Sequence, residues 1–424
     1  EVWKKISSSP VSNRSSCAEG QTGSARETSR EFRSQGRNYS WCPNTDILCT
    51  LVRCERLMDL PEEILAHIFS FLPLKDKCNA FLVCKTWSNS LTSSSAWTHT
   101  EIRCDSEDCV PQRFSDLLPC IRHLKLIVSV AEPAHRQAGL WVLQQVLARG
   151  DGRLRRLCVS CLGNPPLFYA GQDLLQGLVD VLTDGSSLTA LDLRGVPFTL
   201  SDSFIKSVAA LCPALRSLFI NNSSLVCGVV SETIRDVLKR CPSLNTVGLF
   251  QASVSHDVLR DILEPQRTEL KLLELRCERS LKYVTPLCDQ VWADVRRRHP
   301  GLRVDLELDH TLPELQVPGV LQPSIPVRQL RLHTWTCLLD ELRVVAQSYA
   351  GTLEVLELQT TASPELNTVL VSLATQCRKL REVHCYCVVS QNVIEAFCSM
   401  CPDLHRYTLK TRKELHPWTY TTLR

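Results

Sequence analysis

Most of this 424-residue chain repeats one short apolar pattern, and the repetition limits the folds that the chain can adopt. Each copy is a triplet of apolar residues, in which the second follows the first by three positions and the third follows the second by two. Leu188, Leu191 and Leu193 are an example. Intervals of 24 to 34 residues separate the copies, which is typical of leucine-rich repeats. The copies begin at Ile121, Leu154, Leu188, Leu215, Leu244, Leu270, Leu302, Val327, Leu353, Leu380 and Leu404, and the copy at Leu302 is looser than the others.

Helical stretches lie between the apolar triplets. Residues 201–211 and 231–238 each place their apolar side chains on one helical face. One strand and one helix cannot bury their apolar faces alone, whereas a stack of such units can. The sequence therefore predicts an α/β solenoid that is curved, with parallel strands inside the arc and helices outside. Because proline does not continue a helix, the helices are expected to end at the residues before four prolines, which are Cys212, Cys241, His299 and Cys401.

The stretch from Leu60 to Trp97 has a different pattern, which predicts several short helices. Pro61 suits the first turn of a helix, Pro73 ends that helix, and Asp76 is expected to cap the next one. Roughly 40 residues cannot bury so many large apolar side chains internally. Part of this surface is therefore expected to contact another protein. The apolar residues at helical spacing in the first helix are Ile64, Leu65, Ile68, Phe69 and Leu72.

These residues resemble the motif of the F-box family. The motif begins with Leu-Pro, continues with an Ile-Leu and an Ile-Phe pair, and ends with Val-Cys-Lys-x-Trp and a distal Trp. The resemblance implies an all-helical F-box that binds a Skp-type adaptor and, through it, the cullin and RING subunits of an SCF ubiquitin ligase. The residues expected to bind the adaptor are Leu60, Pro61, Ile64, Leu65, Ile68, Phe69, Leu72, Leu82, Val83, Trp87 and Trp97.

The apolar triplets resemble the cysteine-containing leucine-rich repeats of the F-box/leucine-rich-repeat family. Together, the two resemblances imply an F-box in residues 58–104 and about eleven repeats, some of them degenerate, in residues 105–420. The register of the repeats between residues 277 and 326 stays open, because proline-rich spacers interrupt the pattern there.

The first 57 residues differ in composition from the rest of the chain. They are rich in serine and have little periodic apolar character, so we expect a disordered or non-native extension. Position 1 is Glu, and Met58 directly precedes the F-box motif. We therefore favour translated upstream sequence, with Met58 as the natural start, over a regulatory tail with phosphorylatable serines.

Composition also narrows the compartment and the partners. A formal net charge of +3 gives no electrostatic case for nucleic acid, and no run of 18 apolar residues indicates a membrane span. The polar N-terminus lacks the apolar segment of a secretory signal, so we expect a cytoplasmic, or else nuclear, protein in which the 22 cysteines form no disulfides.

Two close spacings, Cys158 with Cys161 and Cys385 with Cys387, lack a second ligand pair, so no metal site and no cofactor are expected.

Two non-enzymatic functions stay open. The leading one is the substrate-recognition subunit of an SCF-type E3 ubiquitin ligase, whose repeats hold an unidentified protein substrate for ubiquitination and proteasomal degradation. The alternative is an F-box scaffold that acts outside a ubiquitin ligase. The neighbours His384 and Cys385 are not expected to form a catalytic pair, because adjacent strand residues point to opposite faces.

Strand alternation predicts which side chains face the inside of the arc, since the residue between two core-facing apolar residues points away from the core. His384, Tyr386, Arg406 and Lys410 combine an aromatic ring with cationic or titratable groups, a mixture enriched at binding hot spots. We call these four residues the C-terminal cluster and expect the substrate to bind there. The other residues expected to be exposed inside the arc are Arg194, Phe219, Asn221, Phe250, Glu274, Arg276, Arg331, His333 and Glu357.

Overall fold

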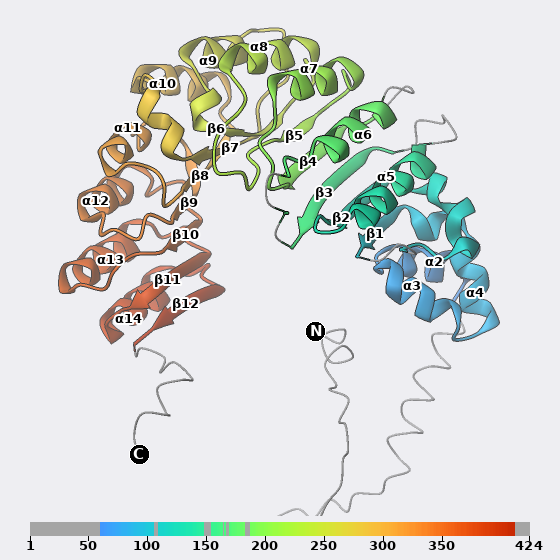
Figure 1. The fold of residues 1–424 in the computed structure, drawn as a ribbon. Helices are drawn as coiled ribbons and strands as arrows, with labels where there is room; N and C mark the ends of the chain where they lie inside the picture. The colour runs from blue at the N-terminus through green and yellow to red at the C-terminus, as the bar shows by residue number, and fades with distance from the viewer. Residues whose placement is uncertain are drawn as a thin grey trace, which may run out of the picture. The chain divides into compact units, whose positions relative to one another are not determined.

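A computed structural model describes residues 60–105, 109–147, 154–163, 165–166, 169–182 and 187–411. The expectation for residues 1–57 lies outside this part of the chain. The described residues belong to one compact unit, in which short helices precede a curved parallel sheet (Figure 1). The strands line the inner side of the arc and the helices cover its outer side, so the predicted solenoid is confirmed.

The first four helices of the described residues form what we call the helical module. Pro73 rather than Asp76 occupies the N-cap of the second helix, so the predicted cap is wrong. Asp76 lies instead in the first turn, where its carboxylate complements the positive end of the helix dipole. The helices are α2 (Glu62–Ser70), α3 (Leu74–Phe81), α4 (Lys85–Thr92) and the 3-10 helix η2 (Ser94–Trp97).

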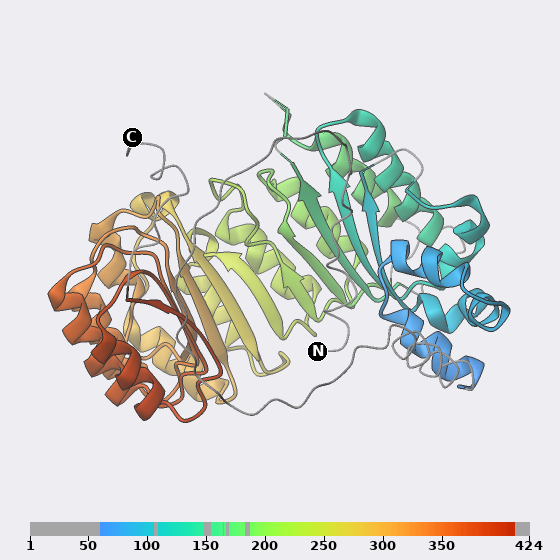
Figure 2. The ribbon, with the colours of Figure 1, turned by 90° about the horizontal axis from the view of Figure 1, so that it is seen from below.

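Within the described residues, twelve parallel strands form one sheet whose order follows the chain, as the view from below shows (Figure 2). This is one strand more than the eleven repeats counted in the sequence. The extra strand, β1, has the degenerate triplet Trp97, Thr100 and Ile102, and its register with β2 places Thr100 beside Leu124. The strands are β1 (His99–Cys104), β2 (His123–Ser129), β3 (Arg156–Leu162), β4 (Ala190–Gly195), β5 (Ser217–Phe219), β6 (Thr246–Phe250), β7 (Leu272–Cys277), β8 (Arg303–Leu308), β9 (Val327–Leu332), β10 (Val355–Leu358), β11 (Glu382–Val388) and β12 (Arg406–Lys410).

Helices return the chain from the end of one strand to the start of the next. The two predicted helical stretches, residues 201–211 and 231–238, are confirmed as α7 and α8. The Ser201 hydroxyl caps α7 by accepting the Phe204 N–H at 3.3 Å. The helices are α5 (Pro133–Leu147), α6 (Gln172–Leu182), α7 (Asp202–Leu211), α8 (Ser231–Arg240), α9 (His256–Ile262), α10 (Asp289–Arg298), α11 (Val317–Val320), α12 (Leu339–Ser348), α13 (Pro364–Gln376) and α14 (Gln391–Met400), with the 3-10 helices η3 (Gln112–Cys120), η4 (Gln251–Ser253), η5 (Arg279–Tyr283) and η6 (Glu314–Gln316).

Buried cysteines occupy the corner between a helix and the following strand. Cys212, Cys241, Cys377 and Cys401 are the C-caps of their helices and are at most 2% exposed. The Cys241 thiol donates to the Cys212 carbonyl at 3.5 Å, and the Cys401 thiol donates to the Cys377 carbonyl at 3.6 Å. Burial raises the pKa of Cys377 to about 12. These thiols therefore act as small core residues that link successive repeats.

The last triplet departs from the others. Leu404 and Leu409 are only partly buried, and Tyr407 is 51% exposed. The reason is position, since β12 is the terminal strand of the described sheet and receives packing from β11 alone. The core of the solenoid, by contrast, is a continuous cluster of buried triplet side chains. None of the described helices has the length and hydropathy needed to span a bilayer.

Candidate protein-interaction site

The structure divides the residues expected to bind an adaptor into a buried set and an exposed set. Leu65, Phe69 and Trp97 are at most 3% exposed and form the core of the helical module. The Trp97 indole N–H donates to the Leu91 carbonyl at 2.9 Å, and Phe69 packs edge-on against Trp87 with ring centroids 5.1 Å apart. Three of the expected contacts are thus structural supports that an adaptor cannot reach without unfolding the module.

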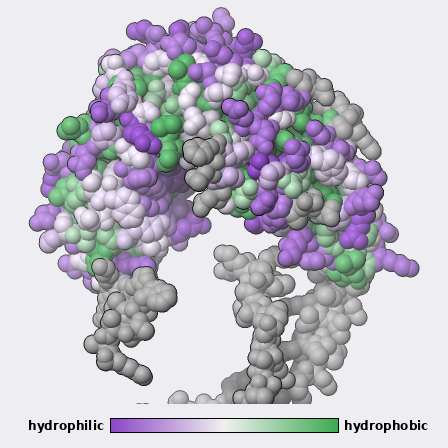
Figure 3. All heavy atoms as spheres, in the orientation of Figure 1, coloured by the Kyte–Doolittle hydropathy of each residue, from purple (hydrophilic) through white to green (hydrophobic). Residues whose placement is uncertain are grey.

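The exposed set lies on the outside of the helical module. Ile64 is 48% exposed, Leu82 is 71% exposed and Val83 is 54% exposed, and we call these three residues the apolar triad. A hydrophobic area is visible over this end of the unit (Figure 3). Large apolar side chains left this open are typical of an interface without its partner. Pro61 is also exposed, whereas Leu60, Ile68, Leu72 and Trp87 are half-buried.

A buried lysine joins the helical module to the sheet, and sequence reasoning missed it. Lys77 on α3 is fully buried, and its Nζ donates to Ala96 O at 2.8 Å, to His99 O at 2.9 Å and to Thr100 Oγ1 at 3.0 Å. The same ammonium lies 5.0 Å from the centroid of the Trp97 ring. Burial lowers the pKa of Lys77 to about 7. Lys77 follows no apolar spacing, so the sequence pattern contains no signal for this role.

Ion pairs cover the middle of the concave face. The Arg194 guanidinium on β4 reaches Glu274 on β7 at 3.1 Å and lies 4.2 Å from the Phe219 ring. This long bridge passes over β6, where Gly248 has no side chain: an added Cβ would lie 2.2 Å from Asn221 Oδ1. Across neighbouring strands, further pairs join Arg276 to Asp309 at 2.8 Å and Arg331 to Glu357 at 3.2 Å, and His333 Nε2 lies 3.2 Å from a carboxylate oxygen of Glu357.

One residue expected to be exposed inside the arc is buried. Phe250 is 4% exposed, because the Arg276 guanidinium from the adjacent strand lies 5.9 Å from its ring centroid. The strand register, which places Phe250 beside Arg276, agrees with the predicted orientation. The error is therefore in the exposure alone, since alternation gives the direction of a side chain and not what covers it.

The C-terminal cluster lies on the two last strands. His384 and Arg406 both approach Glu382, at 3.8 Å and 3.2 Å, and His384 Nδ1 lies 3.0 Å from Thr408 Oγ1. Tyr386 is 54% exposed, and burial together with a hydrogen bond to the Glu357 carboxylate raises its pKa. Lys410 is exposed and pairs with Val388, beyond an irregularity in the strand register. His384 and Arg406 therefore share Glu382 as a partner.

His384 and Cys385 lie on opposite faces of β11. His384 belongs to the concave face, whereas Cys385 is 1% exposed in the core, where its sulfur lies 3.4 Å from the sulfur of Cys387. Burial raises the pKa of Cys385 to about 12, so this thiol is a poor nucleophile at neutral pH. In the described ranges, no three His, Cys, Asp or Glu side chains are close enough to hold a metal ion.

A helical module with an exposed apolar triad, followed by a leucine-rich-repeat solenoid, defines the class of F-box/leucine-rich-repeat proteins. A family model described as F-box-like matches residues 57–103. The chain is 42% identical over 365 residues to F-box/LRR-repeat protein 8 of Homo sapiens, which covers 85% of this chain and 97% of the human protein. It is 41% identical over 373 residues to the Mus musculus protein of the same name, over 87% of this chain and 100% of the mouse protein. The chain therefore belongs to the F-box/LRR-repeat protein 8 family.

A solved structure, described as the crystal structure of the TLR13-ssRNA13 complex, is a distant neighbour. It is 13% identical to this chain, with a TM-score of 0.28 over 77% of this chain and 54% of that one. Proteins of the F-box/LRR family are typically non-catalytic adaptors, and F-box domains in general bind Skp1-type adaptors.

Proposed function

We propose that this chain is the substrate-recognition subunit of an SCF-type E3 ubiquitin ligase. In this proposal, the F-box binds the Skp-type adaptor and, through it, the cullin and RING subunits, while the concave face of the solenoid binds a protein substrate. The ubiquitin-transfer chemistry takes place on other subunits. This chain contributes proximity, which raises the effective concentration of the substrate lysine near the charged ubiquitin carrier.

The observation that supports the proposal most directly is the apolar triad. Ile64, Leu82 and Val83 together expose about as much apolar surface as one to two complete aliphatic side chains. The buried neighbours Leu65, Phe69 and Trp97 hold the helices that present the triad. A preformed apolar surface on a rigid helical support is what a stable protein interface requires.

The adaptor interface can be tested by substituting alanine at all three triad positions in one variant. Burying an aliphatic side chain stabilises an interface by about 1.5–3 kcal/mol. Scaled by the exposures above, the triple substitution is expected to cost about 3–5 kcal/mol, which weakens binding roughly 150- to 5000-fold. Calorimetric titration with the purified Skp-type adaptor measures this loss.

A matched control has alanine at Leu225, Val230 and Leu315, which are 62%, 49% and 92% exposed on the solenoid. This variant should bind the adaptor like the wild type, and both triple variants should keep the wild-type melting temperature. Equal adaptor affinity for the triad variant and the wild type would refute the proposed interface. The proposal includes residence in the cytoplasm or the nucleus, which imaging of a tagged chain tests.

A further inference from the structure

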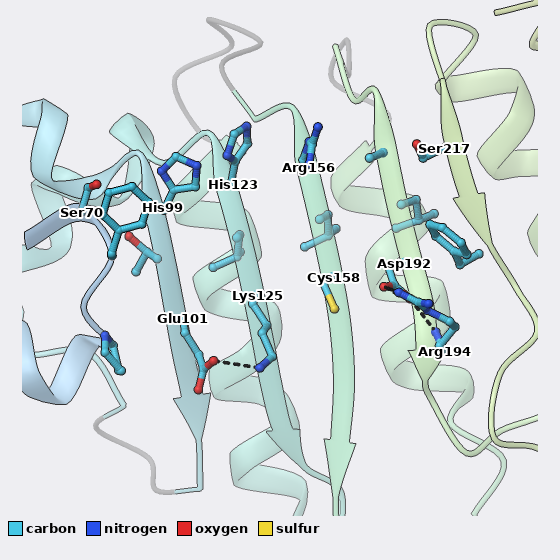
Figure 4. A pocket seen from close by; sticks show the side chains of 18 of the residues that line it. Ser70, His99, Glu101, His123, Lys125, Arg156, Cys158, Asp192, Arg194 and Ser217 are labelled. Carbon is cyan, nitrogen blue, oxygen red and sulfur yellow. Dashed lines mark hydrogen bonds and ion pairs between the residues drawn. The ribbon is translucent and has the colours of Figure 1, made fainter. Parts of the chain in front are cut away.

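A groove of about 510 Å³ opens on the concave face where the F-box meets the first strands (Figure 4). Phe71 and Pro73, which follow α2, form one wall. The beginnings of β1 to β5 form its floor, so both domains contribute to the groove. It lies at the opposite end of the arc from the C-terminal cluster (Figure 1).

Three nitrogen-bearing side chains form a row along this groove. In the strand register, His99 on β1 pairs with His123 on β2, which pairs in turn with Arg156 on β3. The two imidazole rings lie 4.3 Å apart between centroids. Figure 4 shows the three side chains next to one another at the starts of their strands. We call them the basic row.

The basic row has no counter-charge within the described residues. The carboxylates that line the groove are already paired, Glu101 with Lys125 at 2.9 Å and Asp192 with Arg194 at 2.6 Å. No carboxylate of the described residues forms an ion pair with any member of the row, and the buried Nδ1 of His99 has no hydrogen-bond partner there. This arrangement contrasts with the rest of the concave face, where arginines have acidic partners.

Apart from burial, the groups that shift the pKa values of the two histidines are all basic, although the paired carboxylates Glu101 and Asp192 also line the groove. Burial, and then the neighbouring basic groups Lys77, His67 and Arg156, lower the pKa of His99. Burial also lowers the pKa of His123, together with His99, Arg156 and Arg122. An anion placed in the groove would reverse this effect, since an opposite charge favours the protonated imidazole.

An exposed aromatic ring lies next to the row. Phe71 is 63% exposed and stacks on His99, with ring centroids 5.4 Å apart and an angle of 19° between the planes. The groove therefore offers an apolar platform beside the Arg156 guanidinium and two imidazoles that an anion would help to protonate. An acidic side chain with an apolar neighbour in an extended peptide matches both features.

We propose that this groove binds an acidic segment of a protein partner, whose carboxylate or phosphate group contacts the basic row while an adjacent apolar side chain packs on Phe71. This inference rests on the proposed function in one respect, which is that the acidic segment belongs to the substrate. The chain's own terminal segments fit less well, because residues 1–57 and 412–424 each contain more basic than acidic residues. The occupant is therefore a separate polypeptide.

The test measures fluorescence anisotropy of labelled peptides with the purified full-length chain. A glutamate oligomer and a phosphoserine-containing Gly-Ser peptide supply the two anions, and a glutamine oligomer is the neutral control. Both acidic peptides, or one of them, should bind, and Arg156→Gln should weaken that binding about tenfold. Arg303→Gln removes an exposed arginine at the start of β8, outside the groove, and should leave the affinity unchanged.

A pH series adds a second readout with the glutamate oligomer, whose carboxylates stay ionised above about pH 5. Binding should tighten about threefold or more from about pH 7.5 to about pH 6, because the bound anion favours protonated histidines. The double variant His99→Gln, His123→Gln should weaken this dependence, leaving only the part that Lys77 contributes, since its pKa is about 7, and should keep the melting temperature of the wild type.

Three results would overturn the inference: no binding of either acidic peptide, equal effects of Arg156→Gln and Arg303→Gln, or tighter binding of a single-stranded RNA oligonucleotide than of both peptides. Titration with the Skp-type adaptor separates this inference from the proposed function. Groove variants should bind the adaptor normally, so loss of peptide binding alone concerns the groove. If the wild type fails to bind the adaptor, the proposed ligase function is refuted, whereas the inference about the groove is unaffected.

Discussion

Lys77 gives the sharpest prediction about how the F-box stabilises the solenoid. Thr98 O accepts N–H groups of Arg122 and His123 at the start of β2, so His99 O points to the free edge of β1, where Lys77 Nζ donates to it. Exposed strand edges are usually covered in native proteins, and α3 covers this one. Lys77 is thus part of the N-terminal cap of the repeat stack.

The perturbation is Lys77→Met, which keeps an unbranched apolar side chain and removes the titrating group. In the wild type, the folded chain releases the Lys77 proton near pH 7, whereas the unfolded chain keeps it up to the ordinary lysine pKa of 10.5. Because the unfolded state binds more protons between these values, the free energy of unfolding rises with pH in that window. Lys77 is half deprotonated at pH 7 in the folded chain, so at 1.36 kcal/mol per pH unit the wild type should gain about 2 kcal/mol over the variant from about pH 7 to about pH 9.

Urea denaturation of both chains at the two pH values measures this difference, and other titrating groups cancel because both chains contain them. At neutral pH, the three hydrogen bonds of Lys77 and the cost of desolvating its ammonium oppose each other, so the change with pH is the clearer readout. Lys75→Met, on the exposed side of the same helix, should stay within about 0.5 kcal/mol of the wild type at neutral pH. A wild-type advantage over Lys77→Met that is constant from pH 7 to pH 9 would refute this account of Lys77.

Three further substitutions test other parts of the structure. Trp97→Ala should lower the free energy of unfolding by about 3–5 kcal/mol in urea denaturation, because the side chain is fully buried; a loss of adaptor binding without a loss of stability would show instead a direct contact. Gly248→Ala should lower the free energy of unfolding by about 1–3 kcal/mol in the same assay, since the added Cβ would displace Asn221 from Glu274. An unchanged free energy of unfolding would mean that the contact between Asn221 and Glu274 does not stabilise the fold. Replacing the C-terminal cluster with small neutral residues should slow substrate ubiquitination at least about tenfold while adaptor binding persists, and a wild-type rate would place the substrate elsewhere.

The fold could be predicted because its signal is local and repeated. Each triplet such as Leu188, Leu191 and Leu193 fixes a strand and its buried face, and each Cys-Pro step fixes the end of a helix. The register between residues 277 and 326, which the sequence left open, follows once the triplets of neighbouring strands are aligned. Leu306, for example, pairs with Leu275 on one side and with Leu330 on the other. Strand β1 was missed because Thr100 replaces the apolar residue at the centre of its triplet.

The functional surfaces were less predictable because they depend on contacts between distant segments. The F-box motif does not say which of its residues are supports: Leu65 is buried and Ile64 is exposed, although both match the motif. The burial of Phe250 depends on a side chain from the next repeat. The basic row likewise forms only when three strands bring His99, His123 and Arg156 together, since these residues are 24 and 33 positions apart in the chain.

The most direct test of the central claim is the ubiquitin occupancy of the proteins that this chain captures. Mass spectrometry of glycine-glycine remnants on lysine, under proteasome inhibition, compares cells that express the wild type, the triad variant or a chain without residues 105–420. We expect the wild type and the triad variant to capture the same proteins and the shortened chain to lose them, with raised remnants on these proteins in wild-type cells alone. Equal remnants with the wild type and the triad variant would contradict the account and would indicate a scaffold that acts outside a ubiquitin ligase.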